Sequence, residues 1–230
     1  MLAAINTCPW LTKTTDYDAD GNFSDSPKVK GVSVGIPMGF VMIDGEIWNT
    51  NWTTEENVMD SNYTTHEVKN QKAFYVLNDR TYKITSTPSI DITVSSARTG
   101  ATVTVDGINR APAPNLMLLY NKRIYDQSVA YADAYEVYIE CDSSEFRVGQ
   151  PITGTVTAVY KNKNVTYANN DWIEERPAIG ENTVVISARG STIAELAASG
   201  FAVGDTLTVN CSTKSPYVCR ADNGRLLHPR

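Results

Sequence analysis

The strongest constraint on the fold is an alternation of apolar and polar residues with a period of two. It occurs in residues 89–95, 101–105 and 135–140. Successive side chains of a β-strand point to opposite faces, so this pattern predicts strands with one buried face. Residues 72–84 and 154–167 predict two hairpins, with turns at Asn78-Asp79 and Asn162-Lys163. We therefore expect a chain built mainly of strands.

One segment has a helical signature. Thr192 and Glu195 have the spacing of a capping box, Ile193, Leu196 and Ala197 would form one apolar face, and Gly200 would end the helix. Predicted strands at 184–186 and 206–209 flank this segment. The predicted fold class is α+β: a β-rich single domain with a mixed or antiparallel sheet and few short helices.

Composition limits the possible functions. The chain has 230 residues, 42% of them hydrophobic, and we expect one globular domain over 1–230. A net charge of -6 argues against nucleic acid or an anionic membrane as a partner, because both require a basic surface. No apolar run is long enough to span a bilayer, so no membrane insertion is expected. No signal peptide is visible after Met1.

The sequence bears on two types of metal site. Four cysteines without a CxxC pair and only two histidines argue against zinc, and the sequence leaves the disulfide state of the cysteines open. Asp16, Asp18 and Asp20, followed by Gly21, have the spacing of a calcium-binding loop. Position twelve of that loop is Pro27 instead of the usual Glu, so an acidic surface loop is the alternative to a bound Ca²⁺.

Six short segments occur in a characteristic order along the chain. They are Ala4–Trp10, Ile36–Gly45, Val105–Arg110, Leu118–Asn121, Tyr135–Val137 and Val184–Gly190. In this order they resemble the phosphodiester glycosidase family, which includes the catalytic domain of the mannose-6-phosphate uncovering enzyme (N-acetylglucosamine-1-phosphodiester alpha-N-acetylglucosaminidase) and secreted bacterial relatives. The resemblance implies a secreted hydrolase that cleaves a sugar-1-phosphodiester on surface or extracellular glycan material.

The resemblance also implies a set of site residues. Glu136 matches the family's carboxylate, Asn109 and Arg110 match its Asn-Arg pair, and Asn6 matches the Asn of the first segment. Tyr120 is the expected substrate-binding aromatic residue. In these roles Arg110 would hold the phosphate through two parallel hydrogen bonds, and Glu136 would transfer a proton.

The sequence departs from the family in one respect. Relatives carry an Asp-Gly-Gly-Gly-Ser-like segment further along the chain, and this segment is absent here. Relatives also have strands before the first of the six segments. The resemblance therefore predicts a domain that is incomplete at both ends. Two alternatives stay open: a non-catalytic carbohydrate-binding module, with tryptophans and tyrosines as stacking platforms, and a calcium-stabilised cell-surface domain.

Overall fold

The computed structural model describes residues 39–50, 72–76 (backbone alone for 73 and 74), 81–110, 115–125, 134–160 and 178–215, and the backbone of four two-residue strands. Eight strands form one sheet in the order β10-β9-β16-β14-β13-β15-β12-β11. Their bounds are β9 (Asp91–Ser96), β10 (Thr102–Val105), β11 (Gly107–Ile108), β12 (Met117–Tyr120), β13 (Tyr135–Cys141), β14 (Ile152–Tyr160), β15 (Thr183–Ala188) and β16 (Thr206–Ser212).

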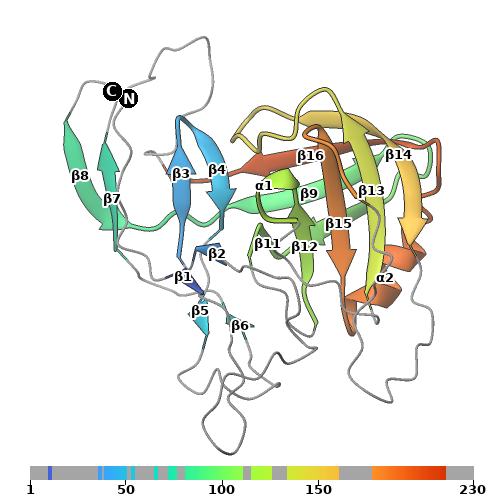
Figure 1. Cartoon of the computed structure of the whole chain (residues 1–230), viewed down its shortest axis with the longest axis horizontal. Coiled ribbons are helices and arrows are strands. Elements are labelled where there is room, and N and C mark those ends of the chain that lie inside the picture. The colour runs from blue at the N-terminus through green and yellow to red at the C-terminus, as the bar shows by residue number, and fades with distance from the viewer. Residues whose placement is uncertain are drawn as a thin grey trace, which may run out of the picture.

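Four two-stranded sheets and two short helices complete the described part of the chain (Figure 1). The strand pairs are β1 (Trp10–Leu11) with β2 (Ile36–Pro37), β3 (Val41–Ile43) with β4 (Glu46–Asn49), β5 (Thr53–Thr54) with β6 (Thr65–His66), and β7 (Lys72–Val76) with β8 (Tyr82–Ser86). The helices are α1 (Lys122–Tyr125) and α2 (Thr192–Ala198). No helix in the described residues is long and apolar enough to cross a membrane.

The large sheet is nearly closed into a barrel. Its first strand, β10, continues through the single residue Asp106 into its last strand, β11, so residues 102–108 form both edges. The Asp106 backbone N–H donates to Met117 O at 2.7 Å, and the Met117 N–H donates to Asp106 Oδ2 at 2.7 Å. This pair of hydrogen bonds fastens β10 to β12 and leaves few open edge groups.

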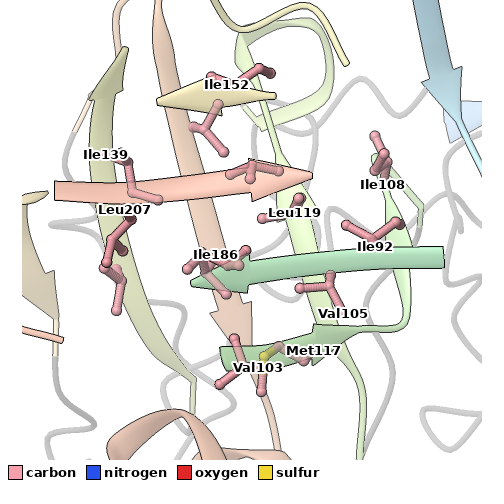
Figure 2. Packing of buried hydrophobic residues seen from close by; sticks show 14 of the residues in the cluster. Ile92, Val103, Val105, Ile108, Met117, Leu119, Ile139, Ile152, Ile186 and Leu207 are labelled. Carbon is pink, nitrogen blue, oxygen red and sulfur yellow. The ribbon is translucent and has the colours of Figure 1, made fainter. Parts of the chain in front are cut away.

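The main hydrophobic core lies inside the barrel. Strands β9 and β16 run crosswise to β12, β15 and β13 (Figure 1), as in orthogonal sheet packing. Ile92, Leu119, Ile186 and Leu207 all point into the space between the two groups of strands (Figure 2), and each is at most 1% exposed. The alternation in the sequence arises here, because every second residue of these strands enters this core.

Helix α2 lies at one end of the barrel and contacts β13 and β15. Its Ile193 and Leu196 pack against the core, while Ala197, predicted to share that face, is exposed. The predicted capping box is wrong. Ser191 occupies the N-cap without a side-chain bond, and the Thr192 hydroxyl instead bonds to the Arg189 backbone and to Leu116 O at 3.0 Å. Gly200, with a φ of 68°, follows the helix as expected.

An ion pair joins the β9–β10 turn to the start of β16. Arg98 donates to both carboxylate oxygens of Asp205 and, at 2.7 Å, to Gly200 O. The hydrogen bond from Arg98 holds the pKa of Asp205 below its usual range. A lowered pKa means that this stabilisation is present above the ordinary Asp range and is lost as the pH falls into the acid region.

The β-rich prediction is confirmed, whereas the α+β label is not: two short helices in the described residues form no layer, so the protein is mainly β. The sheet is mixed, because β11 pairs parallel to β12 and all other pairs are antiparallel. The two strands of the 72–84 hairpin are confirmed as β7 and β8, and its predicted turn at Asn78-Asp79 lies outside the described residues. The second half of the 154–167 hairpin lies outside the described residues; β14 pairs with β13 and β16.

The two hydrogen bonds between Asp106 and Met117, which we call the Asp106 clasp, can be tested by mutation. Asp106→Ala removes the acceptor for the Met117 N–H and should lower the free energy of unfolding by about 1–2 kcal/mol, the usual range for a charge-assisted hydrogen bond at a partly solvated position. Asp106→Asn keeps a carbonyl acceptor and should lose less. The measurement is urea unfolding. Asp91→Ala, at another exposed strand position, is the control; equal losses for both alanine variants would contradict the clasp.

Candidate functional site

Strand β13 presents different chemistry on its two faces. Val137 and Ile139 enter the barrel core, while Glu136 and Tyr138 lie on the opposite side. On that side Tyr138 belongs to a second apolar cluster with Leu118, Tyr120, Ile124, Tyr125, Ile179 and Val185. We call this side of β14, β13, β15, β12 and β11 the outer face.

The strand register brings five residues into one row across the outer face. Glu136 pairs with Tyr160 of β14 on one side and with Ser187 of β15 on the other, Ser187 pairs with Leu118, and Leu118 with Gly107 of β11. We call these five the Glu136 row. It brings the predicted carboxylate onto the same face as the strand that leads to Arg110.

Glu136 is 1% exposed and is held by a chain of hydroxyl groups. The Tyr138 hydroxyl donates to Glu136 Oε2 at 2.6 Å, and the Tyr125 hydroxyl lies 2.9 Å from that of Tyr138. Because Tyr138 has one proton, which Glu136 accepts, Tyr125 is the donor to Tyr138. Burial, followed by the charge of Glu136, raises the pKa of Tyr138, so this hydroxyl stays protonated and stays a donor.

Arg110 folds back over the end of the Glu136 row. It is 3% exposed, and its backbone carbonyl accepts a hydrogen bond from the Tyr120 hydroxyl at 3.0 Å. A Cβ added at Gly107 would lie 2.5 Å from Arg110 Cδ and 2.6 Å from Thr50 Oγ1. Glycine at position 107 therefore makes the room in which the Arg110 side chain lies, and it places that side chain on the outer face.

Asn109 supports this arrangement from the opposite direction. With a φ of 50° it adopts the left-handed conformation that Asn tolerates better than most residues. Its Nδ2 donates to Trp48 O at 2.8 Å and to Asn121 Oδ1 at 3.0 Å, and its Oδ1 accepts from the Asn121 N–H at 3.1 Å. Both amide protons are thus engaged within the protein, so Asn109 shapes the turn that carries Arg110.

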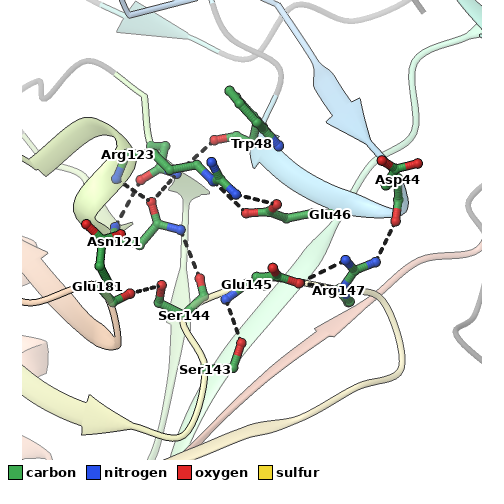
Figure 3. Close-up of polar contacts among 11 residues, drawn as sticks. Asp44, Glu46, Trp48, Asn121, Arg123, Ser143, Ser144, Glu145, Arg147 and Glu181 are labelled. Atoms are coloured by element: carbon green, nitrogen blue, oxygen red, sulfur yellow. Dashed lines mark hydrogen bonds and ion pairs between the residues drawn. The ribbon is translucent and has the colours of Figure 1, made fainter. Parts of the chain in front are cut away.

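An ion pair between the exposed Arg123 and the buried Glu46 anchors the neighbouring hairpin. Arg123 donates to both oxygens of Glu46 at 2.7 Å, and its guanidinium lies 4.2 Å from the centre of a Trp48 ring (Figure 3). Asn121 extends the network to Ser144 O at 2.9 Å. These contacts hold β4 against α1 and position Asn109, so they are structural support for the Arg110 turn.

The other predicted residues have different outcomes. Tyr120 is 1% exposed and its hydroxyl bonds to Arg110, so it contacts a predicted site residue. Asn6 and the calcium-loop residues Asp16, Asp18 and Asp20 lie outside the described residues. No cluster of three or more potential metal ligands occurs within the described part of the chain. Calcium binding therefore stays a prediction from the sequence.

A surface hollow of about 340 Å³ lies outside the Glu136 row. It is lined by residues of the loop after β13 and the start of β14, including Glu145 and Arg147. These two side chains bond to each other at 2.9 Å, and Arg147 also donates to Asp44 O at 2.5 Å (Figure 3). Because Glu145 and Arg147 are paired with each other and none of the predicted residues lines the hollow, we do not assign the site to it.

Two outer-face residues were not predicted from the sequence to belong to the site. Tyr138 and Ser187 both lie at strand positions that point away from the barrel core. Tyr138 donates a hydrogen bond to Glu136, and Ser187 is paired with Glu136 across β13 and β15. The period-two pattern does place Tyr138 on the face of Glu136, two residues away. Only the pairing of β13 with β15 brings Ser187 beside Glu136, and no local pattern encodes that register.

The comparisons with known proteins bear on the fold. No family model and no curated protein matches the chain. Among solved structures it is similar to a hypothetical protein from Synechocystis, with a TM-score of 0.50 and 18% identity, over 79% of this chain and 26% of that one. A protein of Burkholderia pseudomallei K96243 described as a "Putative exported protein" has a TM-score of 0.45 and 13% identity, over 80% of this chain and 35% of that one. The first similarity shows a shared fold.

The calcium loop can be tested without knowledge of its geometry. If Asp16, Asp18 and Asp20 bind Ca²⁺, then Ca²⁺ at ten times its Kd should stabilise the protein by about 1.4 kcal/mol and raise Tm. Asp18→Ala should abolish the shift, and Asp91→Ala should preserve it. No Tm shift at millimolar Ca²⁺ would leave the acidic-loop interpretation.

Proposed function

We propose that the chain is a hydrolase of sugar-1-phosphodiesters, acting on surface or extracellular glycan material. The observation that carries the proposal is a buried cation, Arg110, and a buried carboxylate, Glu136, on one face of the sheet. Three strand spacings of roughly 4.8 Å separate Gly107 from Glu136, about 14 Å in all. A sugar ring together with its phosphate has dimensions of this order.

Arg110 is suited to the phosphate. Its planar guanidinium can donate two parallel hydrogen bonds to the oxygens of a phosphodiester. Because Arg110 is 3% exposed, water screens its charge weakly, and an anion bound there would be stabilised more than at the surface. Gly107 leaves room for this side chain, and Tyr120 and Asn109 hold the backbone turn that carries it before substrate arrives, which supports a binding role.

Glu136 is suited to proton transfer. Tyr138 fixes one of its oxygens, so the orientation of the carboxyl group is set by the protein. In the proposed reaction Glu136 accepts a proton from a water molecule as that water attacks the anomeric carbon. The bond between the anomeric carbon and the phosphate oxygen breaks, and a free sugar and a phosphomonoester leave. Arg110 stabilises the phosphate as it departs.

Two further parts of the proposal come from the sequence. A location outside the cell or in the cell envelope of a bacterium rests on the family resemblance, and a Ca²⁺ ion that stabilises the domain rests on the spacing of Asp16, Asp18 and Asp20. Asn6, from the first matching segment, would orient a sugar hydroxyl. The alternative is a carbohydrate-binding module of the same fold, which would bind the sugar phosphate without cleaving it.

The catalytic roles predict a defined pattern of mutant activities. Glu136→Gln keeps an acceptor for Tyr138 but cannot take a proton, so kcat should fall by about 10²- to 10⁴-fold. Arg110→Lys keeps the charge and loses the planar pair of N–H donors, so kcat/KM should fall by about 10- to 100-fold. The measurement is sugar release from methyl phosphodiesters of the 1-phosphates of glucose, mannose, galactose and N-acetylglucosamine.

Each variant has a matched control. Glu140→Gln alters an exposed carboxylate on the same strand and face, and Arg147→Lys alters an ion-paired arginine of the surface hollow. Both controls should retain wild-type kinetics. Binding of these diesters without turnover would favour the carbohydrate-binding alternative, while neither binding nor turnover would overturn the proposal.

A further inference from the structure

We propose that Ser187 is a further substrate-contacting residue, whose hydroxyl donates a hydrogen bond to a phosphate oxygen of the diester between Arg110 and Glu136. This inference rests on the proposed function. It adds a third polar contact to the site and places the phosphate above the middle of the Glu136 row.

The position of Ser187 follows from the strand register. Ser187 is paired directly with Glu136 on β13 and directly with Leu118 on β12. Directly opposed residues of antiparallel strands have Cβ atoms about 4.5–5.5 Å apart. Leu118 is in turn paired with Gly107, over which Arg110 lies. Ser187 is therefore the polar side chain between the carboxylate and the guanidinium in this row.

Exposure to solvent points to the same residue. Glu136, Leu118 and Arg110 are 1%, 2% and 3% exposed, whereas Ser187 is partly exposed. Its strand neighbours Ile186 and Ala188 are fully buried in the barrel core. A ligand that spans Arg110 and Glu136 along the row must therefore cover the Ser187 side chain.

The chemistry of Ser187 fits a phosphate oxygen. Within the described residues its hydroxyl has no hydrogen-bond partner, so the O–H is available to a ligand. An anionic oxygen is a strong acceptor, and hydrogen bonds to charged groups are about twice as strong as neutral ones. The side chain is also small, so a bulky group bound between Glu136 and Arg110 has room above it. Ser187 keeps its proton throughout and takes no part in bond breaking.

The test uses a set of substitutions at one position. Ser187→Ala removes the donor and should lower kcat/KM for the methyl sugar-1-phosphodiesters by about 10- to 100-fold. Ser187→Thr keeps the hydroxyl, and Ser187→Val has nearly the shape of Thr without it. Ser187→Thr should retain most of the activity, and Ser187→Val should lower kcat/KM as much as Ser187→Ala or more. A melting curve for each variant separates folding from function.

Ser95→Ala is the matched control, because Ser95 is a partly buried serine of β9, outside the Glu136 row. It should have wild-type kinetics. Equal kcat/KM for wild type, Ser187→Ala and Ser187→Val, with Glu136→Gln still inactive, would overturn the role of Ser187 and leave the proposed function standing. A wild-type chain that neither binds nor cleaves the diesters would overturn both.

Discussion

Between β10 and β11 the chain has one residue, Asp106, and its hydrogen bonds to Met117 hold the two edges of the sheet together. The outer face depends on this closure. Gly107 follows directly and fixes the end of the Glu136 row, and the chain then turns at Asn109 to bring Arg110 back over it. If the clasp opened, β11 would keep its pairing with β12 but would lose its fixed connection to β10, and the position of Arg110 relative to Glu136 would be less well defined.

The barrel core and the candidate site use the same strands for different purposes. Val137, Ile139 and Ile186 fill the interior, and their neighbours Glu136, Tyr138 and Ser187 face the other way. Burial of the apolar residues fixes the register, because a slip by one residue would turn Glu136 into the core. The stability of the core thus sets the geometry of the polar row. The hydroxyl chain from Tyr125 through Tyr138 then orients the carboxylate within that row.

Much of the fold could be predicted from the sequence, because period-two patterning reports directly which residues of a strand are buried. Strands β9, β10 and β13, the β7–β8 hairpin and helix α2 fall where the pattern placed them. The cap of α2 could not be predicted, since Thr192 bonds to Leu116, a residue that only tertiary structure brings near. The bonds of Asn109 are likewise tertiary: the sequence offered it as a site residue through the family resemblance, and the fold bonds its amide group to Trp48 and Asn121. Ser187 could not be predicted because only the pairing of β15 with β13 and β12 brings it beside Glu136 and Leu118.

The central claim is that Arg110 and Glu136 bind one sugar phosphodiester from the two sides of Ser187 in the Glu136 row. A crystal structure of the protein with a non-hydrolysable sugar-1-phosphonate ester tests it most directly. We expect the phosphonate oxygens within hydrogen-bond distance of the Arg110 guanidinium and the anomeric carbon beside the Glu136 carboxyl group. A ligand bound elsewhere, for instance in the hollow lined by Glu145 and Arg147, with the outer face empty, would contradict it.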